Sequence, residues 1–201
     1  MEIPRNLEIT QEEMRERKCM DSRRWMCMAR AQYPRSCGIS SLTSCFNYLF
    51  STLGTGTQRP ISTEEALEAL GFRPPYDNIN FGSLTGNDTL IAWFYLLCRH
   101  YKVKGKAKIM WKLHGKSTTP AIDEQKAFEM LSSGLQGTEK TYIYHCWDHY
   151  MCPIGYEITP LRPMNAYKSL KDIGEFERWL IIGEISKAHP VFHVKKWADV
   201  A

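Results

Sequence analysis

Hydrophobic residues recur every three or four positions at several places in the first half of the chain. The clearest run has the spacing of a buried helix face and consists of Ile39, Leu42, Cys45, Phe46 and Leu49. Just before it, Pro34 keeps the preceding residue extended, and Ser36 is a suitable N-cap. We therefore predict a helix that begins near Cys37 and ends before Gly54.

Three further segments carry helix signals. Ser62 and Glu65 have the spacing of a capping box, and Gly71 follows the apolar positions that close this segment. Large apolar residues fill the stretch from Leu90 to His100, and a fourth helical pattern covers about Asp123 to Leu131, ahead of Gly134. The alternating charges from Glu12 to Lys18 indicate a charged helix or arm.

Strand patterns are concentrated in the second half of the chain. The predicted strands cover residues 107–113, 141–145, 150–158, 179–185 and 191–194. Helices followed by an antiparallel sheet make an α+β arrangement. We expect a charged N-terminal arm at residues 1–24 and one domain at residues 25–201.

Composition and charge limit the classes of partner. Hydrophobic residues make up 43% and charged residues 24% of the chain, as in globular proteins with a core. The net charge is only +4, and the one basic cluster, Lys102 to Lys108, is more often a solvated turn, so we expect no nucleic-acid partner. The polar N-terminus and the lack of a long apolar stretch predict neither a signal peptide nor a membrane span. Seven cysteines without a disulfide framework are typical of a reduced, cytoplasmic compartment.

Cys37 has the position of an activated thiol. At the first turn of a helix, the positive end of the macrodipole and the free backbone N–H groups favour the thiolate, which is the nucleophilic form. Gly38 leaves room beside the sulfur, and the amide of Gln32 could donate to a developing oxyanion. The alternative is that Cys37 is a small buried residue at the start of a helix.

A nucleophile of this kind needs a base and an acid. His149 opens a strand-like run and can reach over its edge toward a helix N-terminus, while His145 is the competing base. Glu184 ends the apolar run of the next strand and is the first candidate for the acid that orients the imidazole. Asp148 and Asp199 are weaker candidates, and each of these residues could also be an ordinary core or surface group.

Cofactor chemistry finds little support in the sequence. The stretch from His145 to Cys152 holds four candidate zinc ligands, but it lacks paired C-x-x-C spacing. In a strand the neighbours His145 and Cys146 point to opposite faces, so they cannot share one ion. The glycines at 54–56 and 82–86 match no nucleotide-binding loop. We therefore expect neither a metal nor another cofactor.

Several longer stretches resemble the basic immunoglobulin-like variable motif-containing protein family. They cover nearly all of the chain after Arg24 and include residues 32–47, 64–67, 70–75, 142–150, 152–157 and 195–199. Despite the family's name, the helical first half argues against an immunoglobulin sandwich.

A more distant resemblance is to the bacteriocin-processing cysteine peptidases, and it implies a papain-like fold. It rests on Cys-Gly before an apolar helix, an upstream Gln, a His-Tyr pair, and an acid after an apolar strand. It assigns Gln32 to the oxyanion, Cys37 to the nucleophile, His149 to the base and Glu184 to the acid. Two features depart from that pattern: the acid there is usually Asp followed by Pro, and Gln32 is one residue closer to the cysteine than usual.

The sequence thus supports two functions. One is a thiol hydrolase or acyltransferase that acts on peptide or isopeptide bonds. The other is a catalytically silent papain-like fold that binds a protein or peptide partner, for example in a cytoskeletal or ciliary microtubule assembly. A fold alone does not decide between them.

Overall fold

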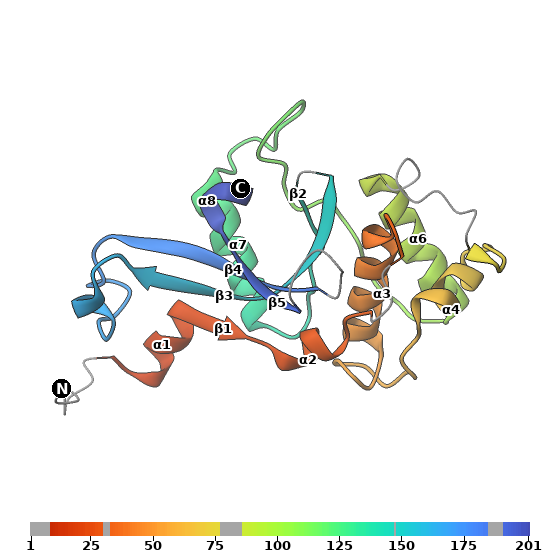
Figure 1. Cartoon of the computed structure of the whole chain (residues 1–201), viewed down its shortest axis with the longest axis horizontal. Helices are drawn as coiled ribbons and strands as arrows, with labels where there is room; N and C mark the ends of the chain where they lie inside the picture. Colours follow the sequence, from red (N-terminus) through yellow and green to blue (C-terminus); the bar gives the residue numbers. More distant parts are fainter. Residues whose placement is uncertain (1–8, 30–32, 77–85, 147, 185–190) are drawn as a thin grey trace.

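The computed structural model describes residues 9–29, 33–76, 86–146, 148–184 and 191–201. Helices α3 (Cys37–Phe50), α4 (Thr63–Ala69) and α6 (Asn87–His100) form one side of the molecule, and an antiparallel sheet with α7 (Glu124–Gln136) forms the other (Figure 1). The mixed helical and antiparallel arrangement predicted from the sequence is confirmed. Among the described residues, no helix is long and apolar enough to span a membrane.

The sheet is built around one long central strand, β3 (His149–Pro160). It has the order β1-β3-β4-β5, from β1 (Lys18–Met20), β4 (Phe176–Gly183) and β5 (Phe192–Lys196), while β2 (Tyr144–Cys146) also pairs with β3. All of these pairs are antiparallel, and a register shift between Pro153 and Gly155 places the proline at a bulge. Cys152 pairs with Gly183, so the start of β3 and the end of β4 lie side by side at one end of the sheet.

Two hydrophobic clusters meet near that end of the sheet. One is formed by α3, α4 and α6 and includes Ile39, Phe46 and Leu97, together with Tyr150 of β3. The other lies between α7 and the sheet and includes Phe128 and Leu180. Because α3 packs directly on β3, the N-terminus of α3 comes close to the start of β3.

The predicted N-terminal arm is joined to the sheet over its described part. The helix α1 (Gln11–Arg17) has a capping box at Thr10 and leads into β1, and α2 (Ser22–Met26) follows. Arg24 is buried: it donates to the carbonyls of Lys140 and Gly137 at 2.8 Å, and its guanidinium lies 4.2 Å from the centre of the Tyr48 ring. The hydrogen bonds of its two terminal nitrogens, the carboxylate of Asp21 at 3.8 Å from Nε and the aromatic face make this buried charge tolerable.

The predicted helices occur where the sequence places them, but two of them are longer: α6 begins at Asn87 and not at Leu90, and α7 extends past its predicted end. The α7 pattern was expected to stop before Gly134, but the helix continues to Gln136. Packing explains the glycine at this position, since a Cβ added to Gly134 would lie 1.7 Å from the Tyr142 hydroxyl oxygen. The remaining short elements are the 3-10 turn η2 (Pro163–Asn165) and α8 (Trp197–Val200).

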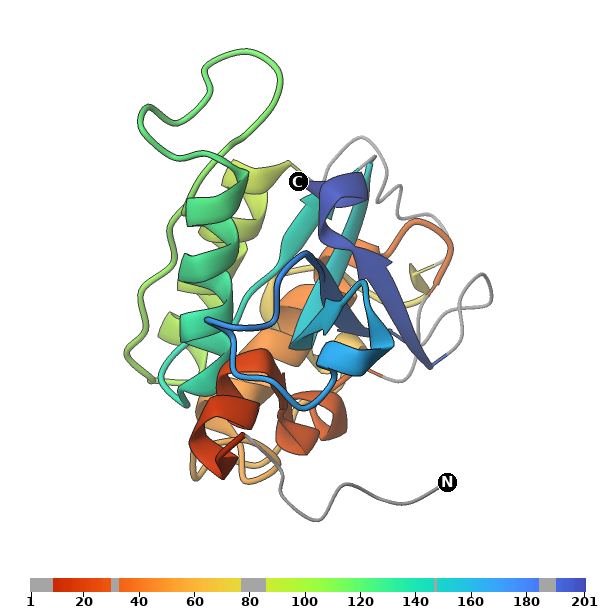
Figure 2. The ribbon, with the colours of Figure 1, turned by 90° about the vertical axis from the view of Figure 1, so that its left-hand side faces the viewer.

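The strand prediction was wrong at two places. Residues 107–113 form no strand and belong instead to an irregular segment that runs along the outer side of the helices (Figure 2). The hydroxyl group of Tyr95 on α6 bonds both the N–H and the C=O of Ala107, so a side chain replaces a partner strand there. Conversely, the three residues of β1 were not predicted, because so short a strand shows no alternation over several residues. The other predicted strands correspond to β2, β3, β4 and β5.

Candidate functional site

Cys37 is the first residue of α3, as the sequence predicts. Ser36 occupies the N-cap position but its side chain makes no capping hydrogen bond, and its hydroxyl instead pairs with that of Ser40 at 3.2 Å. The first N–H groups of the helix therefore remain directed toward the region of the Cys37 sulfur. Cys37 is half-buried, so its thiol is not enclosed in the core.

His149 and Glu184 are brought together by the pairing of β3 and β4. His149 is the first residue of β3, and Glu184 directly follows the last residue of β4. The Nε2 atom of His149 lies 2.8 Å from Oε1 of Glu184. The Glu184 side chain is only 2% exposed, whereas the imidazole is 28% exposed. The buried Glu184 carboxylate thus fixes the Nε2 side of the imidazole, while the rest of the ring stays partly accessible to solvent.

The thiol of Cys37 interacts with the same imidazole. Hydrogen bonds to Cys37 and to Glu184 raise the pKa of His149 to about 9. Burial raises the pKa of the Cys37 thiol, but hydrogen bonds from His149 and from the N–H groups of Tyr150 and Gly38 outweigh it, so that the pKa is lowered overall. With Nε2 bonded to Glu184, we infer that Nδ1 faces the sulfur. This combination favours a thiolate–imidazolium pair at neutral pH.

The competing residues lie elsewhere. His145 is on β2, where its ring stacks on that of Tyr150 with centroids 4.2 Å apart. Burial lowers its pKa. Asp148 and Asp199 are exposed, and the carboxylate that bonds the imidazole of His149 is that of Glu184. Gln32, the predicted oxyanion donor, lies outside the described residues.

A second histidine beside the acid was not found from the sequence. Nε2 of His193, on β5, lies 3.9 Å from Oε2 of Glu184, and its side chain is 13% exposed. Each oxygen of Glu184 therefore faces a histidine. The signal in the sequence is the alternation of Phe192, His193 and Val194, which places a polar group on the inward face of an edge strand.

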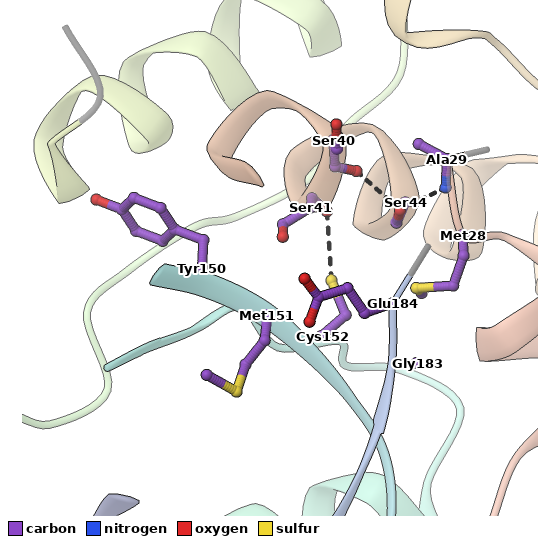
Figure 3. A pocket seen from close by; sticks show the side chains of 10 residues that line it. All are labelled: Met28, Ala29, Ser40, Ser41, Ser44, Tyr150, Met151, Cys152, Gly183 and Glu184. Carbon is purple, nitrogen blue, oxygen red and sulfur yellow. Dashed lines mark hydrogen bonds between the residues drawn. The ribbon is translucent and has the colours of Figure 1, made fainter. Parts of the chain in front are cut away.

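A small cavity lies between α3 and the ends of β3 and β4, and Figure 3 shows Glu184 reaching across it toward the helix. It is lined by Met28, Ala29, Ser40, Ser41, Ser44, Tyr150, Met151, Cys152, Gly183 and Glu184. Its volume of about 10 Å³ suffices for about one water molecule. The cavity can therefore hold a water molecule beside the Glu184 carboxylate, but it is too small for a substrate. A substrate has to approach Cys37 from the surface of the protein.

The other cysteines do not form a metal centre. Among the described residues, no three His, Cys, Asp or Glu side chains gather in a way that could hold an ion. All seven cysteines are free thiols. Cys152, which pairs with Gly183 next to Glu184, is buried and donates to the carbonyl of Ser41 at 3.6 Å.

Fold and site together define an α+β domain with a Cys–His–Glu constellation at the junction of a helix and a sheet. The chain belongs to the basic immunoglobulin-like variable motif-containing protein family, which matches residues 13–201. The described residues hold one sheet with helices and not two packed sheets, so the family's name does not describe this fold.

Relatives of the same name occur in distant organisms. The chain is 48% identical to one from Xenopus laevis over 189 residues and 47% identical to one from Homo sapiens over 190 residues, in both cases over 94% of this chain. It spans only 38% of the length of these two relatives. A relative from Giardia intestinalis is 30% identical over 206 residues, which is 92% of this chain and 73% of that protein. No solved structure matches the chain.

Proposed function

We propose that this domain is a thiol hydrolase or acyltransferase of papain-like type that acts on peptide or isopeptide bonds. The observation that carries the proposal is the contact of 2.8 Å between His149 and the buried Glu184, on an imidazole that also hydrogen-bonds Cys37 at a helix N-terminus. A nucleophile, a base and an orienting acid from three separate elements converge here. Such a convergence is the geometry that nucleophilic catalysis requires.

The chemistry follows from the charges of these groups. The Cys37 thiolate attacks the carbonyl carbon, and the backbone N–H groups at the start of α3 stabilise the negative oxygen. His149 gives its proton to the departing amine, which leaves an acyl group on Cys37 as a thioester. The neutral imidazole then takes a proton from water, for hydrolysis, or from an incoming amine, for acyl transfer, and as this nucleophile bonds the carbonyl carbon the C–S bond breaks and restores the Cys37 thiolate. Glu184 holds the ring in place and stabilises its charged form.

The burial of Glu184 supports catalysis over a purely structural role. Removing a carboxylate from water costs free energy unless it is paired and hydrogen-bonded. The group that pairs with this carboxylate, which is 2% exposed, is an imidazole that is 28% exposed and also hydrogen-bonds Cys37, so the charge is held where a substrate can reach it. A site in which these groups act on a substrate accounts for the arrangement.

Acylation of Cys37 tests the proposal. The protein is mixed with p-nitrophenyl acetate at pH 7.5, and nitrophenolate release and acetyl-cysteine formation are followed by absorbance and peptide mass spectrometry. We expect an initial burst, an acetyl group on Cys37 that hydroxylamine removes, and continued turnover. Cys37→Ala should abolish the burst and Cys146→Ser, which changes another partly exposed thiol, should keep it.

The same experiment separates the two functions considered from the sequence. Equal acetylation of Cys37 and Cys146 at a slow rate, with no turnover, would contradict catalysis. The domain would then be a binding module that retains the fold. Acetylation of Cys37 without turnover would show that the thiol is activated but that the site does not hydrolyse the acetyl-cysteine.

A further inference from the structure

The segment that joins α6 to α7 has an unusual charge. No acidic residue occurs between Asp88 and Asp123, whereas seven lysines and arginines do: Arg99, Lys102, Lys104, Lys106, Lys108, Lys112 and Lys116. The six lysines are all exposed. None of them takes part in an ion pair with the rest of the described chain.

Alternate residues attach this segment to α6. The N–H of Val103 donates to the carbonyl of Cys98 at 3.0 Å, and the N–H of Gly105 faces the Cys98 sulfur. The N–H and C=O of Ala107 lie 3.2 Å and 3.1 Å from the Tyr95 hydroxyl oxygen. A Cβ on Gly105 would lie 2.6 Å from the Phe94 ring, so the backbone is pressed against the helix there.

The residues in between face the other way. In extended backbone, the N–H and C=O of one residue point to one side and those of the next residue to the opposite side. Backbone groups of residues 103, 105 and 107 contact α6, whereas those of Lys104, Lys106 and Lys108 form no hydrogen bond with a described residue, and this alternation indicates that the segment is locally extended with the lysine backbone groups facing away from α6. Within the described chain these backbone groups and lysine side chains have no hydrogen-bond partner. We call these three residues the lysine edge.

We propose that the lysine edge binds an extended acidic segment of a partner protein by strand addition. Residues two apart in extended backbone are separated by about 6.6 to 6.8 Å, so carboxylates at alternate positions of a peptide match the lysines. The free backbone groups supply the main-chain hydrogen bonds of such an added strand. Exposed lysines also hinder pairing with a second copy of the same edge. The lysines thereby favour an acidic strand over self-association.

The backbone geometry favours a peptide over a nucleic acid. Single-stranded nucleic acid is bound through stacking on exposed aromatic rings as well as through positive charge. The tyrosine and the tryptophan of this segment, Tyr101 and Trp111, are half-buried against the two hydrophobic clusters. The exposed apolar residue next to the lysine edge is Ile109, at 53%, which provides contact area but no base-stacking surface.

A labelled peptide of alternating Glu and Thr, twelve residues long, is the probe, and binding is followed by fluorescence anisotropy. We expect saturable binding that Lys104→Glu, Lys106→Glu and Lys108→Glu together weaken at least about tenfold, because like charges then face each other. The matched control changes Lys126, Lys140 and Lys171 to Glu. These residues are also exposed, so the net charge changes equally at other places. The control should change the affinity by less than about threefold.

A second peptide separates strand addition from charge attraction. Methyl groups on two consecutive backbone nitrogens leave all carboxylates in place but remove hydrogen-bond donors toward either side. We expect this peptide to bind at least about tenfold more weakly. Equal binding of both peptides, or equal loss in both lysine variants, would overturn the proposal. Tighter binding of a single-stranded oligouridylate through the same lysines would also overturn it and assign the surface to nucleic acid.

Discussion

The two histidines of the β2–β3 hairpin show how position decides the chemistry of a side chain. His145 lies on β2 and His149 on β3, four residues apart, and both are partly withdrawn from water. Burial lowers the pKa of His145, whereas hydrogen bonds to Cys37 and Glu184 raise the pKa of His149 to about 9. Burial is common to both residues, so the difference comes from the partners that α3 and β4 deliver to one of them.

The largest expected difference between the two histidines is in their titration. His149 should stay protonated until the pH nears 9, while His145 should lose its proton below its ordinary pKa of about 6.5. The two midpoints should therefore lie more than about 2.5 pH units apart (9 minus 6.5). NMR spectra of imidazole-labelled protein measure both, and the upper midpoint belongs to the Cys37–His149 pair. Midpoints within one unit of each other would contradict the comparison.

This titration also gives a pH dependence of folding. The folded-state pKa of His149 lies above its unfolded value of about 6.5. Its contribution to the free energy of unfolding is thus complete below about pH 6.5 and is lost as the pH rises through about 9. Urea unfolding of wild type and His149→Ala should give curves that approach each other over this interval.

Replacing His149 with Ala should cause the next largest change. Without the imidazole the Cys37 thiol loses a main stabiliser of its thiolate, and burial then raises its pKa to the ordinary value or above. At pH 6.5 only about 1% of such a thiol is ionised, so the rate of alkylation by iodoacetamide should fall by at least about tenfold. The rate is measured by peptide mass spectrometry with Cys146 as the internal reference. An unchanged rate would mean that no ion pair exists.

Glu184→Gln should have a smaller effect of the same kind. The amide keeps the size of the side chain but removes its charge, so the pKa of His149 should fall and the thiolate should be less favoured. We expect the midpoint of the pH profile of Cys37 alkylation to rise by about one pH unit, because each unit corresponds to about 1.4 kcal/mol of lost stabilisation of the thiolate. Thermal unfolding of the variant checks that the fold is retained. If only this variant reacts at the wild-type rate, the acid of the site is another residue.

His145→Ala is the control for His149→Ala. It should change the rate of Cys37 alkylation by less than about twofold, because a substitution that removes only ring stacking leaves the charges of the site in place. The variant loses its aromatic contact with Tyr150, so a modest loss of stability of about 0.5–1.5 kcal/mol is expected. A decrease in alkylation as large as that in His149→Ala would show that both histidines serve the thiol.

Much of this site could be predicted because its residues stand at the ends of strongly patterned elements. The apolar period after Ser36 places Cys37 at a helix start, and the apolar runs of β3 and β4 place His149 and Glu184 at one edge of the sheet. His193 was missed because its proximity to Glu184 depends on how β5 pairs with β4, which no local pattern determines. The same limit applies to residues 107–113, where Tyr95 supplies hydrogen bonds in place of a neighbouring strand.

The separation of the three site residues along the chain has a consequence for synthesis of the protein. Cys37 and His149 are 112 positions apart (149 minus 37), and Glu184 follows 35 positions later. A nascent chain therefore carries its thiol out of the ribosome long before the strands that hold the base and the acid exist. Contacts of such long range also form late in folding. The thiol thus acquires its charged partner only when almost the whole domain has been made, and an incomplete chain carries Cys37 as an ordinary thiol.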